Sequence, residues 1–398
     1  MVSVPLPRPK SGAGARNYYL LKALARQHTV SLLAFLHKNE EGVSDDLPLL
    51  EACAERMQLV ARNESAKRRQ QVMQVLHGQS YWLNRFIAPE MQQALDGMLA
   101  REHYDAVLFE SSLVAGYRVP PGIKVIIDQH NLEHEILQRT YQQEGPSLRK
   151  WYNGREYRLV KQGELERCRG ADLILVTSKR ECLALRQALP QSRIEVVPNG
   201  VDIEAFSRDA AQPETAQQVI FTGTMDYYPN TQAALYFAQH CWPRIRAQVP
   251  DATWQIIGRD PPPEVQRLAK LPGVTVTGWV PDMRQHLAGA AVAIAPLQIG
   301  GGTRLKILEA LAMQRAVVST SLGCEGLELE PGKHVLVADQ PEAFAEAVIE
   351  LLRRPELRQE LGRNGRTLVE MAYSWERCGA ALLEALEGTL ETRGAVCS

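Results

Sequence analysis

Short apolar strands alternate with longer amphipathic segments along most of this 398-residue chain, and this pattern constrains the fold more than any other feature. Such alternation is typical of parallel sheets whose crossover helices cover both faces. Strands are predicted in two blocks, at Thr29–Phe35, Met57–Ala61, Ala106–Phe109, Lys124–Ile127, Leu173–Val176 and Ile194–Val197, and then at Gln218–Phe221, Thr253–Ile257, Val274–Val276, Val292–Ala295, Ala316–Thr320 and His334–Val337. The pattern therefore predicts two doubly wound α/β domains.

The domain boundary is predicted from composition. Residues 203–217 are polar and lack periodicity, so we expect a linker between a first domain at 1–202 and a second that begins at 218. A chain of this length is also too long for one ordinary core. Only Met1–Pro5 precedes a proline-rich turn, so the first strand is either very short or begins upstream.

Composition excludes several classes of protein. A net charge of -1 argues against a nucleic-acid binder, which would carry a basic excess. The seven cysteines are scattered without paired or metal-ligand spacing, which favours reduced thiols in the cytosol. There is no apolar run of membrane-spanning length and no signal-peptide pattern. We therefore expect a cytoplasmic protein without nucleic-acid partners.

A glycine-rich loop opens directly into an amphipathic helix at Gly300–Ala312. Free backbone N–H groups and the helix dipole at such a junction favour an anion. Arg304 and Lys306 add positive charge, and Glu309 lies one turn further on, where it can accept from sugar hydroxyls. The pattern suits a diphosphate, although an isolated glycine run is more often only a tight turn with surface charges.

Five segments, in their order along the chain, resemble the donor domain of a GT-B glycosyltransferase of retaining family 4: Val196–Asp202, Phe221–Asn230, Ile256–Arg259, Val274–Val280 and Lys306–Leu311. The stretch from Met225 is most similar to sugar transferases associated with bacterial exopolysaccharide and exosortase (PEP-CTERM) loci. The resemblance implies two facing Rossmann-like domains with an interdomain cleft. It also implies an acceptor domain at 1–202, a donor domain at 218–373, and a last helix in 374–398 that packs back towards the first domain.

The resemblance implies transfer of a sugar from a nucleotide-diphosphate sugar to an acceptor hydroxyl, with retention and without an essential metal or other cofactor. The acceptor is expected to be a carbohydrate or a lipid-linked glycan. Arg304 and Lys306 would stabilise the leaving diphosphate, Glu309 would position donor hydroxyls, and His130 would orient the transferred sugar. A lone histidine is more often a surface or capping residue.

Other substrate-binding residues are expected in loops that follow strands or precede helices. Gly14 and Arg16 lie before or within a predicted helix that would face the diphosphate, although the same pattern fits a simple loop. Backbone groups of the loop after Val274–Val276 would hold the base. The full set is Gly14, Arg16, Gly223, Gly278, Trp279, Val280, Gly301, Gly302, Thr303 and Leu305.

Neighbouring polar residues in the first domain have alternative interpretations. Glu133 and His134 are predicted to be exposed helix positions. Glu110–Ser112 and Thr177–Ser178 follow strands, so they line the cleft or cap helices, and capping is the better interpretation for Ser178.

Two departures from the family pattern concern the donor site. The family commonly has two glutamates eight positions apart, but Gly301 stands eight positions before Glu309. A basic residue often follows the glycine that corresponds to Gly223, and this chain has none there. Arg304 and Lys306 are therefore expected to provide most of the charge compensation.

A mixture of basic and aromatic residues runs from Lys67–Arg69 to Tyr81–Ile87. It suits contact with the anionic inner face of a membrane, or equally a solvated helix followed by a core-packing aromatic cluster. Two other functions fit the same fold. A sugar-nucleotide epimerase would need acid and base residues on both faces of the sugar, and too few candidates are present. A non-catalytic scaffold of a polysaccharide complex would be expected to lose Lys306 and Glu309, and both are present.

Overall fold

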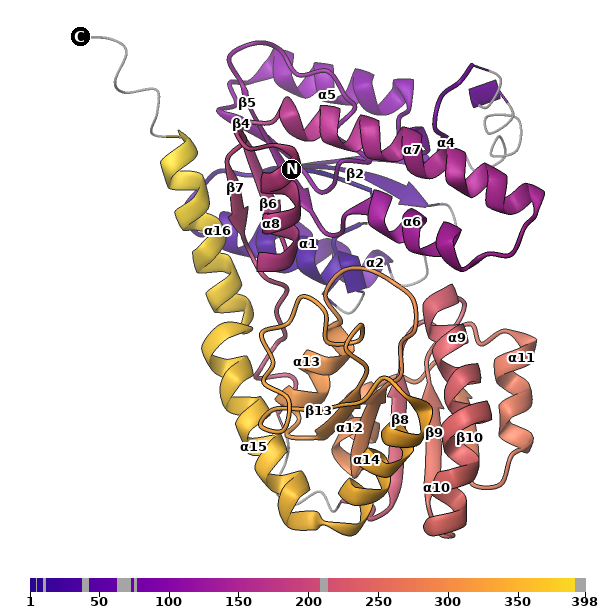
Figure 1. The fold of residues 1–398 in the computed structure, drawn as a ribbon. Coiled ribbons are helices and arrows are strands. Elements are labelled where there is room, and N and C mark those ends of the chain that lie inside the picture. The colour runs from indigo at the N-terminus through magenta and orange to yellow at the C-terminus, as the bar shows by residue number, and fades with distance from the viewer. Residues whose placement is uncertain are drawn as a thin grey trace. The chain divides into compact units, whose positions relative to one another are not determined.

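The computed structural model describes residues 1–4, 6–9, 12–37, 43–62, 73–74, 77–207 and 214–390. The chain forms two compact units (Figure 1). Unit 1 comprises Met1–Asn199 and Trp375–Ser398, and unit 2 comprises Gly200–Ser374. Each unit contains one parallel sheet covered by helices, which confirms the predicted pair of doubly wound α/β domains.

Unit 1 contains a seven-stranded parallel sheet in the order β3-β2-β1-β4-β5-β6-β7. Its strands are β1 (Val2–Ser3), β2 (Ser31–His37), β3 (Arg56–Arg62), β4 (Ala106–Phe109), β5 (Lys124–Gln129), β6 (Leu173–Val176) and β7 (Ile194–Val196). The central strands are apolar and buried, as expected for a sheet with helices on both faces. The strand order reverses at β1 and β4, and ligands of open α/β sheets bind beside the carboxyl ends of strands at such a point.

In this sequence, β1 comprises only Val2 and Ser3. Val2 nevertheless pairs with Leu33 of β2 and Phe109 of β4, so β1 lies at the centre of the sheet. Burial of Val2 and Val4 among β2, β4 and α5 stabilises this strand despite its length.

The helices of unit 1 are α1 (Gly12–Leu24), α2 (Val43–Glu51), α4 (Tyr81–Asn84), α5 (Pro89–Arg101), α6 (Glu133–Gln143), α7 (Leu148–Arg169), α8 (Lys179–Ala188) and α16 (Trp375–Leu390). The C-terminal α16 packs against α1. Tyr19 and Trp375 stack with ring centroids 4.8 Å apart, and Leu382 is fully buried in the same core as Leu20. The chain therefore returns from unit 2 to complete the core of unit 1.

Unit 2 contains a six-stranded parallel sheet in the order β10-β9-β8-β11-β12-β13. Its strands are β8 (Gln218–Thr222), β9 (Thr253–Ile257), β10 (Val274–Gly278), β11 (Val292–Ala295), β12 (Ala316–Ser319) and β13 (Leu336–Val337). Its α-helices are α9 (Tyr228–Tyr236), α10 (Trp242–Gln248), α11 (Pro263–Gln266), α12 (Met283–Gly289), α13 (Leu305–Ala312), α14 (Pro341–Arg353) and α15 (Pro355–Ala372). The order reverses between β8 and β11, beside the start of α13.

The helices α9 and α10 are joined by a π-helical turn at Phe237–Cys241. Pro243 lies in the first turn of α10 and has no N–H to donate to the preceding turn. The sequence contains this proline, but hydrophobic periodicity alone did not show the interruption.

The described parts of the predicted linker are anchored in unit 2. Within the linker, the Phe206 carbonyl accepts from Arg366 Nη1 at 2.8 Å. Glu214 lies 3.0 Å from Arg315 and 2.6 Å from Arg358 in ion pairs. Residues 208–213 lie outside the described part of the chain. The polar composition of 203–217 predicted a linker. In the structure, Glu214 within this segment is tied to unit 2 by two ion pairs.

No described helix is both long and apolar enough to cross a membrane.

Candidate functional site

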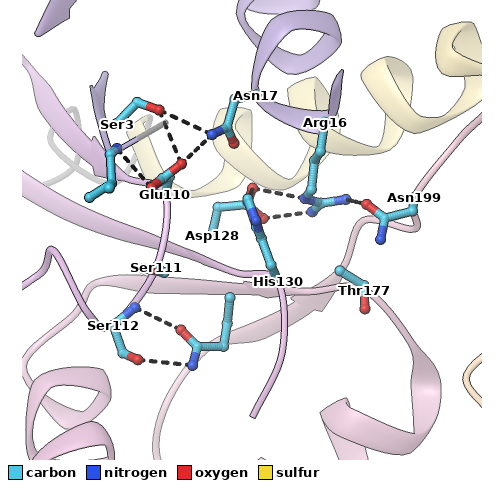
Figure 2. Close-up of polar contacts among 12 residues, drawn as sticks. Ser3, Arg16, Asn17, Glu110, Ser111, Ser112, Asp128, His130, Thr177 and Asn199 are labelled. Carbon is cyan, nitrogen blue, oxygen red and sulfur yellow. Dashed lines mark hydrogen bonds and ion pairs between the residues drawn. The ribbon is translucent and has the colours of Figure 1, made fainter. Parts of the chain in front are cut away.

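In unit 1, a buried ion pair lies at the carboxyl end of β5 (Figure 2). Arg16 donates from Nε to Asp128 Oδ2 at 2.9 Å and from Nη2 to Oδ1 at 2.6 Å. Its Nη1 donates to Asn199 Oδ1 at 3.0 Å and to the Pro198 carbonyl at 3.1 Å. The side chains of both ionic partners are at most 1% exposed. Arg16 thus links α1 and β5 to the last residues before unit 2.

The contact of Arg16 with a donor diphosphate stays a prediction, and the structure shows which protein groups hold this side chain. Its guanidinium is buried and directed at protein acceptors, so it contacts Asp128 rather than an open loop. Burial alone would raise the pKa of Asp128, but the positive charge of Arg16 and the hydrogen bond with His130 outweigh burial and lower that pKa to about 2. Asp128 therefore remains ionised at neutral pH.

His130 lies immediately beyond β5, and its side chain is 13% exposed. Its Nε2 lies 3.2 Å from Asp128 Oδ2, so the ion pair holds the imidazole from one side. Figure 2 shows Asp128 between Arg16 and His130, with the two carboxylate oxygens directed at the arginine. Asp128 is thus a positioning residue for the histidine that the sequence analysis placed against the transferred sugar.

A second buried carboxylate, Glu110, ties the end of β4 to β1 and α1 (Figure 2). It accepts hydrogen bonds from the Val4 N–H at 2.7 Å, from the Ser3 hydroxyl at 3.0 Å and from the Asn17 amide. Burial raises the pKa of Glu110, and the nearby His130 opposes that shift. Glu110 therefore anchors the short first strand beside His130, and it is not free to line a cleft.

Glu133 and His134 are not the exposed helix positions predicted. His134 is 9% exposed, and its Nδ1 lies 2.5 Å from Oε2 of Glu164, which is fully buried in α7. Glu133 accepts from the indole N–H of Trp82 at 2.9 Å, and burial raises its pKa. The partners lie 30 and 51 positions away, so the spacing within one helix could not show them.

The capping interpretation holds for Ser178, whose hydroxyl accepts from the Glu181 N–H at the start of α8. Ser112 is buried, and its N–H donates to Gln129 at 2.8 Å. Gly14 lies in the first turn of α1, and its carbonyl accepts from the Arg8 N–H. Its place at a helix start is as predicted, and its contact with a diphosphate stays a prediction.

The described half of the basic–aromatic stretch packs within unit 1. Leu83 is buried, and the guanidinium of Arg85 lies 3.7 Å above the Trp82 ring. Arg167 donates to the Leu83 carbonyl and to Asn84. These contacts favour the core-packing interpretation for Tyr81–Ile87. Lys67–Arg69 lie outside the described residues.

In unit 2, the glycine-rich loop joins β11 to α13. Gly300 and Gly302 have φ angles of +129° and +71°, a region that disfavours other residue types. Arg304 folds back, and its Nη1 donates to the carbonyls of Gly301 and Gly302. Leu305 begins α13 without a side-chain cap on its N-terminal N–H groups. Arg304 therefore braces the loop, and Thr303 lies within it.

Lys306 lies in the first turn of α13, beside the end of β8. Its Nζ donates to Asn230 Oδ1 at 2.7 Å and lies 4.3 Å from the centroid of the Phe221 ring. The Asn230 amide donates to the Thr224 carbonyl at 2.8 Å. Gly223 has a φ of +153°, and a Cβ atom there would lie 2.7 Å from the Asn230 amide nitrogen and 2.9 Å from the lysine Nζ, so this position disfavours other residue types. The structure thus brings Gly223 and Lys306 together, as expected for one binding site.

The two ionisable groups of α13 have strongly shifted pKa values. Burial, with a contribution from the charge of Arg304, lowers the pKa of Lys306 to about 7. Burial raises the pKa of Glu309 to about 7, opposed by the lysine charge. Such shifts often mark functional sites. An arriving diphosphate would stabilise the ammonium form of Lys306.

The loop after β10 contains Gly278, Trp279 and Val280. Gly278 has a φ of +69°, and its carbonyl accepts from the Gly258 N–H at 3.0 Å. Trp279 is 70% exposed, whereas Val280 packs against the hydrophobic core of unit 2. Contact of this loop with a base stays a prediction.

Sequence reasoning missed one residue in each unit that fixes a candidate side chain. Asn230 fixes the amine of Lys306, and Asp128 fixes His130. Both lie in stretches singled out in the sequence, but each contact depends on the third dimension. The only signal was their location after a strand or in the first turn of a helix.

Comparisons with known proteins agree with this geometry. The family model described as Glycosyltransferase Family 4 matches residues 10–205, and the model described as Glycosyl transferases group 1 matches residues 216–354. A phosphatidyl-myo-inositol mannosyltransferase of Mycolicibacterium smegmatis is 28% identical over 211 residues, which cover 50% of this chain and 53% of that protein. The aligned part is thus about half the length of that relative.

Solved structures share the fold across nearly the whole chain. Sucrose-phosphate synthase from Thermosynechococcus elongatus is 17% identical, with a TM-score of 0.72 over 98% of this chain and 99% of its own. The Anabaena protein HepE, in complex with UDP-glucose, is 14% identical, with a TM-score of 0.68 over 97% and 99%. The fold and the two family models together identify the chain as a glycosyltransferase of the GT-B fold.

Proposed function

We propose that this glycosyltransferase moves a hexosyl unit from a nucleotide-diphosphate sugar to an acceptor hydroxyl with retention of configuration, in the synthesis of an exopolysaccharide or another surface glycan. The observation that carries the proposal is the position of the Lys306 amine. Asn230 holds it beside the glycine-rich loop and the uncapped start of α13. A cation and the positive end of a helix dipole at one point suit a diphosphate leaving group.

The proposed chemistry needs no metal or other cofactor. The bond from the anomeric carbon to the diphosphate breaks, and the electron pair leaves with the diphosphate. The acceptor oxygen bonds to the same face of that carbon, and its proton passes to a departing phosphate oxygen. Lys306 and the N-terminus of α13 stabilise the charge that develops, and Glu309 orients donor hydroxyls. His130, held by Asp128, orients the transferred sugar.

Donor and acceptor classes are supported by the named relatives. HepE was solved with UDP-glucose, which supports a nucleotide-diphosphate sugar as donor. The mannosyltransferase is named for a phosphatidyl-inositol, which supports a lipid-linked acceptor. We further propose that the protein works in the cytoplasm in peripheral contact with the inner face of the membrane, where such an acceptor would lie. Similarity of the Met225–Asn230 stretch to exopolysaccharide-associated transferases supports the pathway class.

The test has two steps. A panel of nucleotide sugars is first screened by thermal stabilisation, because a ligand at a hundred times its dissociation constant adds roughly 2.7 kcal/mol to stability. With the donor found, release of nucleoside diphosphate is measured with and without glycoside and lipid-phosphate acceptors. Release that depends on acceptor supports a transferase. Binding without release indicates a scaffold, and conversion of the donor sugar without release indicates an epimerase.

Lys306→Ala tests the residue assignment. A cation matched to the leaving group matters more in the transition state than in the ground state, so turnover should fall far more than nucleotide affinity. Lys270→Ala, which removes an exposed lysine of the same unit, serves as the matched control. Unchanged turnover of Lys306→Ala at saturating donor would show that Lys306 is only a structural lysine.

A further inference from the structure

The outer face of α7 combines an apolar tip with a row of basic side chains. At its N-terminal end, Leu148 is 88% exposed and Trp151 is 64% exposed, although both are large apolar side chains. Single exposed apolar residues need no explanation, but these two occupy one turn at the tip of the α6–α7 hairpin. Figure 1 shows α7 as a long helix running along the outside of unit 1.

Basic residues continue the same face along the helix. Arg158, Lys161 and Arg169 are exposed and follow Trp151 at intervals of seven, three and eight residues. The exposed side chains on this part of α7 include one carboxylate, Glu166. The other two carboxylates of α7, Glu156 and Glu164, are buried inside unit 1. The outward charge of the helix is therefore positive.

The tip is held in place before any partner arrives. Ser147 caps α7 by accepting from the Lys150 N–H at 3.1 Å. Glu144 accepts from the Asn153 amide at 2.8 Å, pairs with Arg149 at 2.8 Å, and its carbonyl accepts from the Lys150 ammonium at 2.7 Å. These bonds fix the turn that presents Leu148 and Trp151, so little conformational entropy is lost when the tip binds.

We propose that this α7 face, defined by Leu148, Trp151, Arg158, Lys161 and Arg169, binds an anionic lipid surface. Tryptophan and leucine at a helix end suit the headgroup boundary, and cations beside them suit a negatively charged leaflet. Two apolar side chains are too few for the buried core of a stable protein interface, which needs about 800 Å² on each partner. The same two side chains are sufficient to anchor a helix whose remaining attraction is electrostatic.

The inference rests on the proposed function in one respect, the peripheral contact with a membrane. It places that contact on α7 rather than on Lys67–Ile87. It leaves the transfer chemistry untouched. Nucleoside diphosphate binding and release can therefore succeed where vesicle binding fails, and the reverse also holds.

Co-sedimentation with vesicles tests the proposal on the full chain. The parent should bind vesicles of phosphatidylglycerol and phosphatidylcholine, bind phosphatidylcholine alone weakly, and dissociate as salt rises. Each basic residue near an anionic leaflet contributes about fivefold to partitioning, so the triple substitution Arg158→Gln, Lys161→Gln, Arg169→Gln should weaken binding roughly a hundredfold. The matched control, which removes three exposed basic residues of unit 2, is Arg267→Gln, Lys270→Gln, Arg363→Gln.

Quenching by brominated lipid tests the apolar tip directly. Lipid brominated in the upper acyl chain should quench the tryptophan fluorescence of the parent protein. The quenching should fall sharply in Trp151→Phe, which is expected still to bind the vesicles. Circular dichroism and retained nucleotide affinity show that each variant is folded. Equal binding by the α7 triple variant and the control, quenching that persists without Trp151, or no binding of the parent to anionic vesicles would overturn the proposal.

Discussion

Binding of a nucleoside diphosphate to unit 2 should take up close to one proton at pH 8. With a Lys306 pKa of about 7, the Lys306 amine is neutral in about nine-tenths of the protein molecules at that pH before ligand binds. A diphosphate beside the amine favours the ammonium form, because the ligand anion offsets the loss of hydration that burial imposes. Binding therefore drives uptake of about 0.9 proton, and affinity falls by up to about tenfold per pH unit above 7.5.

Isothermal titration calorimetry measures this uptake. Uridine diphosphate is titrated at pH 8 in two buffers of different ionisation enthalpy, and the difference in apparent binding enthalpy gives the number of protons. The terminal phosphate of the ligand, with a pKa near 6, is already ionised at this pH. Lys306→Arg is the control, since a guanidinium remains charged throughout and should bind without proton uptake.

A second variant distinguishes the contribution of Glu309 to proton uptake from that of Lys306. Burial raises the pKa of Glu309 to about 7, so this carboxyl is largely ionised at pH 8 and gains protons only as the pH falls further. Glu309→Gln should therefore retain the proton uptake at pH 8. An affinity that is flat from pH 7.5 to 9 in the parent, with no buffer dependence of the enthalpy, would refute the assignment of Lys306 to the diphosphate.

Two further substitutions test how the site is built. Gly223→Ala places a Cβ 2.9 Å from the Lys306 amine and should lower uridine diphosphate affinity about tenfold, measured by calorimetry. Gly332→Ala, at a φ of +81° with open space around its Cβ, should leave affinity unchanged. Arg16→Met leaves Asp128 buried without its cation and should cost about 3–5 kcal/mol in urea unfolding. Because the depressed pKa of Asp128 stabilises the parent above pH 3.8 and that contribution is lost as pH falls towards 2, the variant should lack this acid-sensitive part.

Much of the fold could be predicted because buried parallel strands are short apolar runs. The predicted Ala106–Phe109, Leu173–Val176, Thr253–Ile257 and Val292–Ala295 coincide with β4, β6, β9 and β11. The predicted β13 began two residues early, at His334, because strand ends depend on pairing rather than on hydrophobicity. The sheet order, and with it the central location of β1, required the structure.

For the candidate site, the sequence shows the loops but not the contacts between side chains. The glycine loop and the helix start at Leu305 follow from local chemistry, so the sequence alone shows them. The partner of Arg16 lies 112 positions away, and that of Lys306 lies 76 positions away. Polar pairing over such separations leaves no periodic signal, which is why the sequence did not show that Arg16 pairs with Asp128.

A crystal structure of the chain with uridine diphosphate tests the central claim most directly. The account predicts the diphosphate against the N-terminus of α13, with a phosphate oxygen within hydrogen-bonding distance of the Lys306 amine and of backbone N–H groups in Gly300–Leu305. A diphosphate bound elsewhere, with this loop unoccupied and Lys306 still donating only to Asn230, would contradict it.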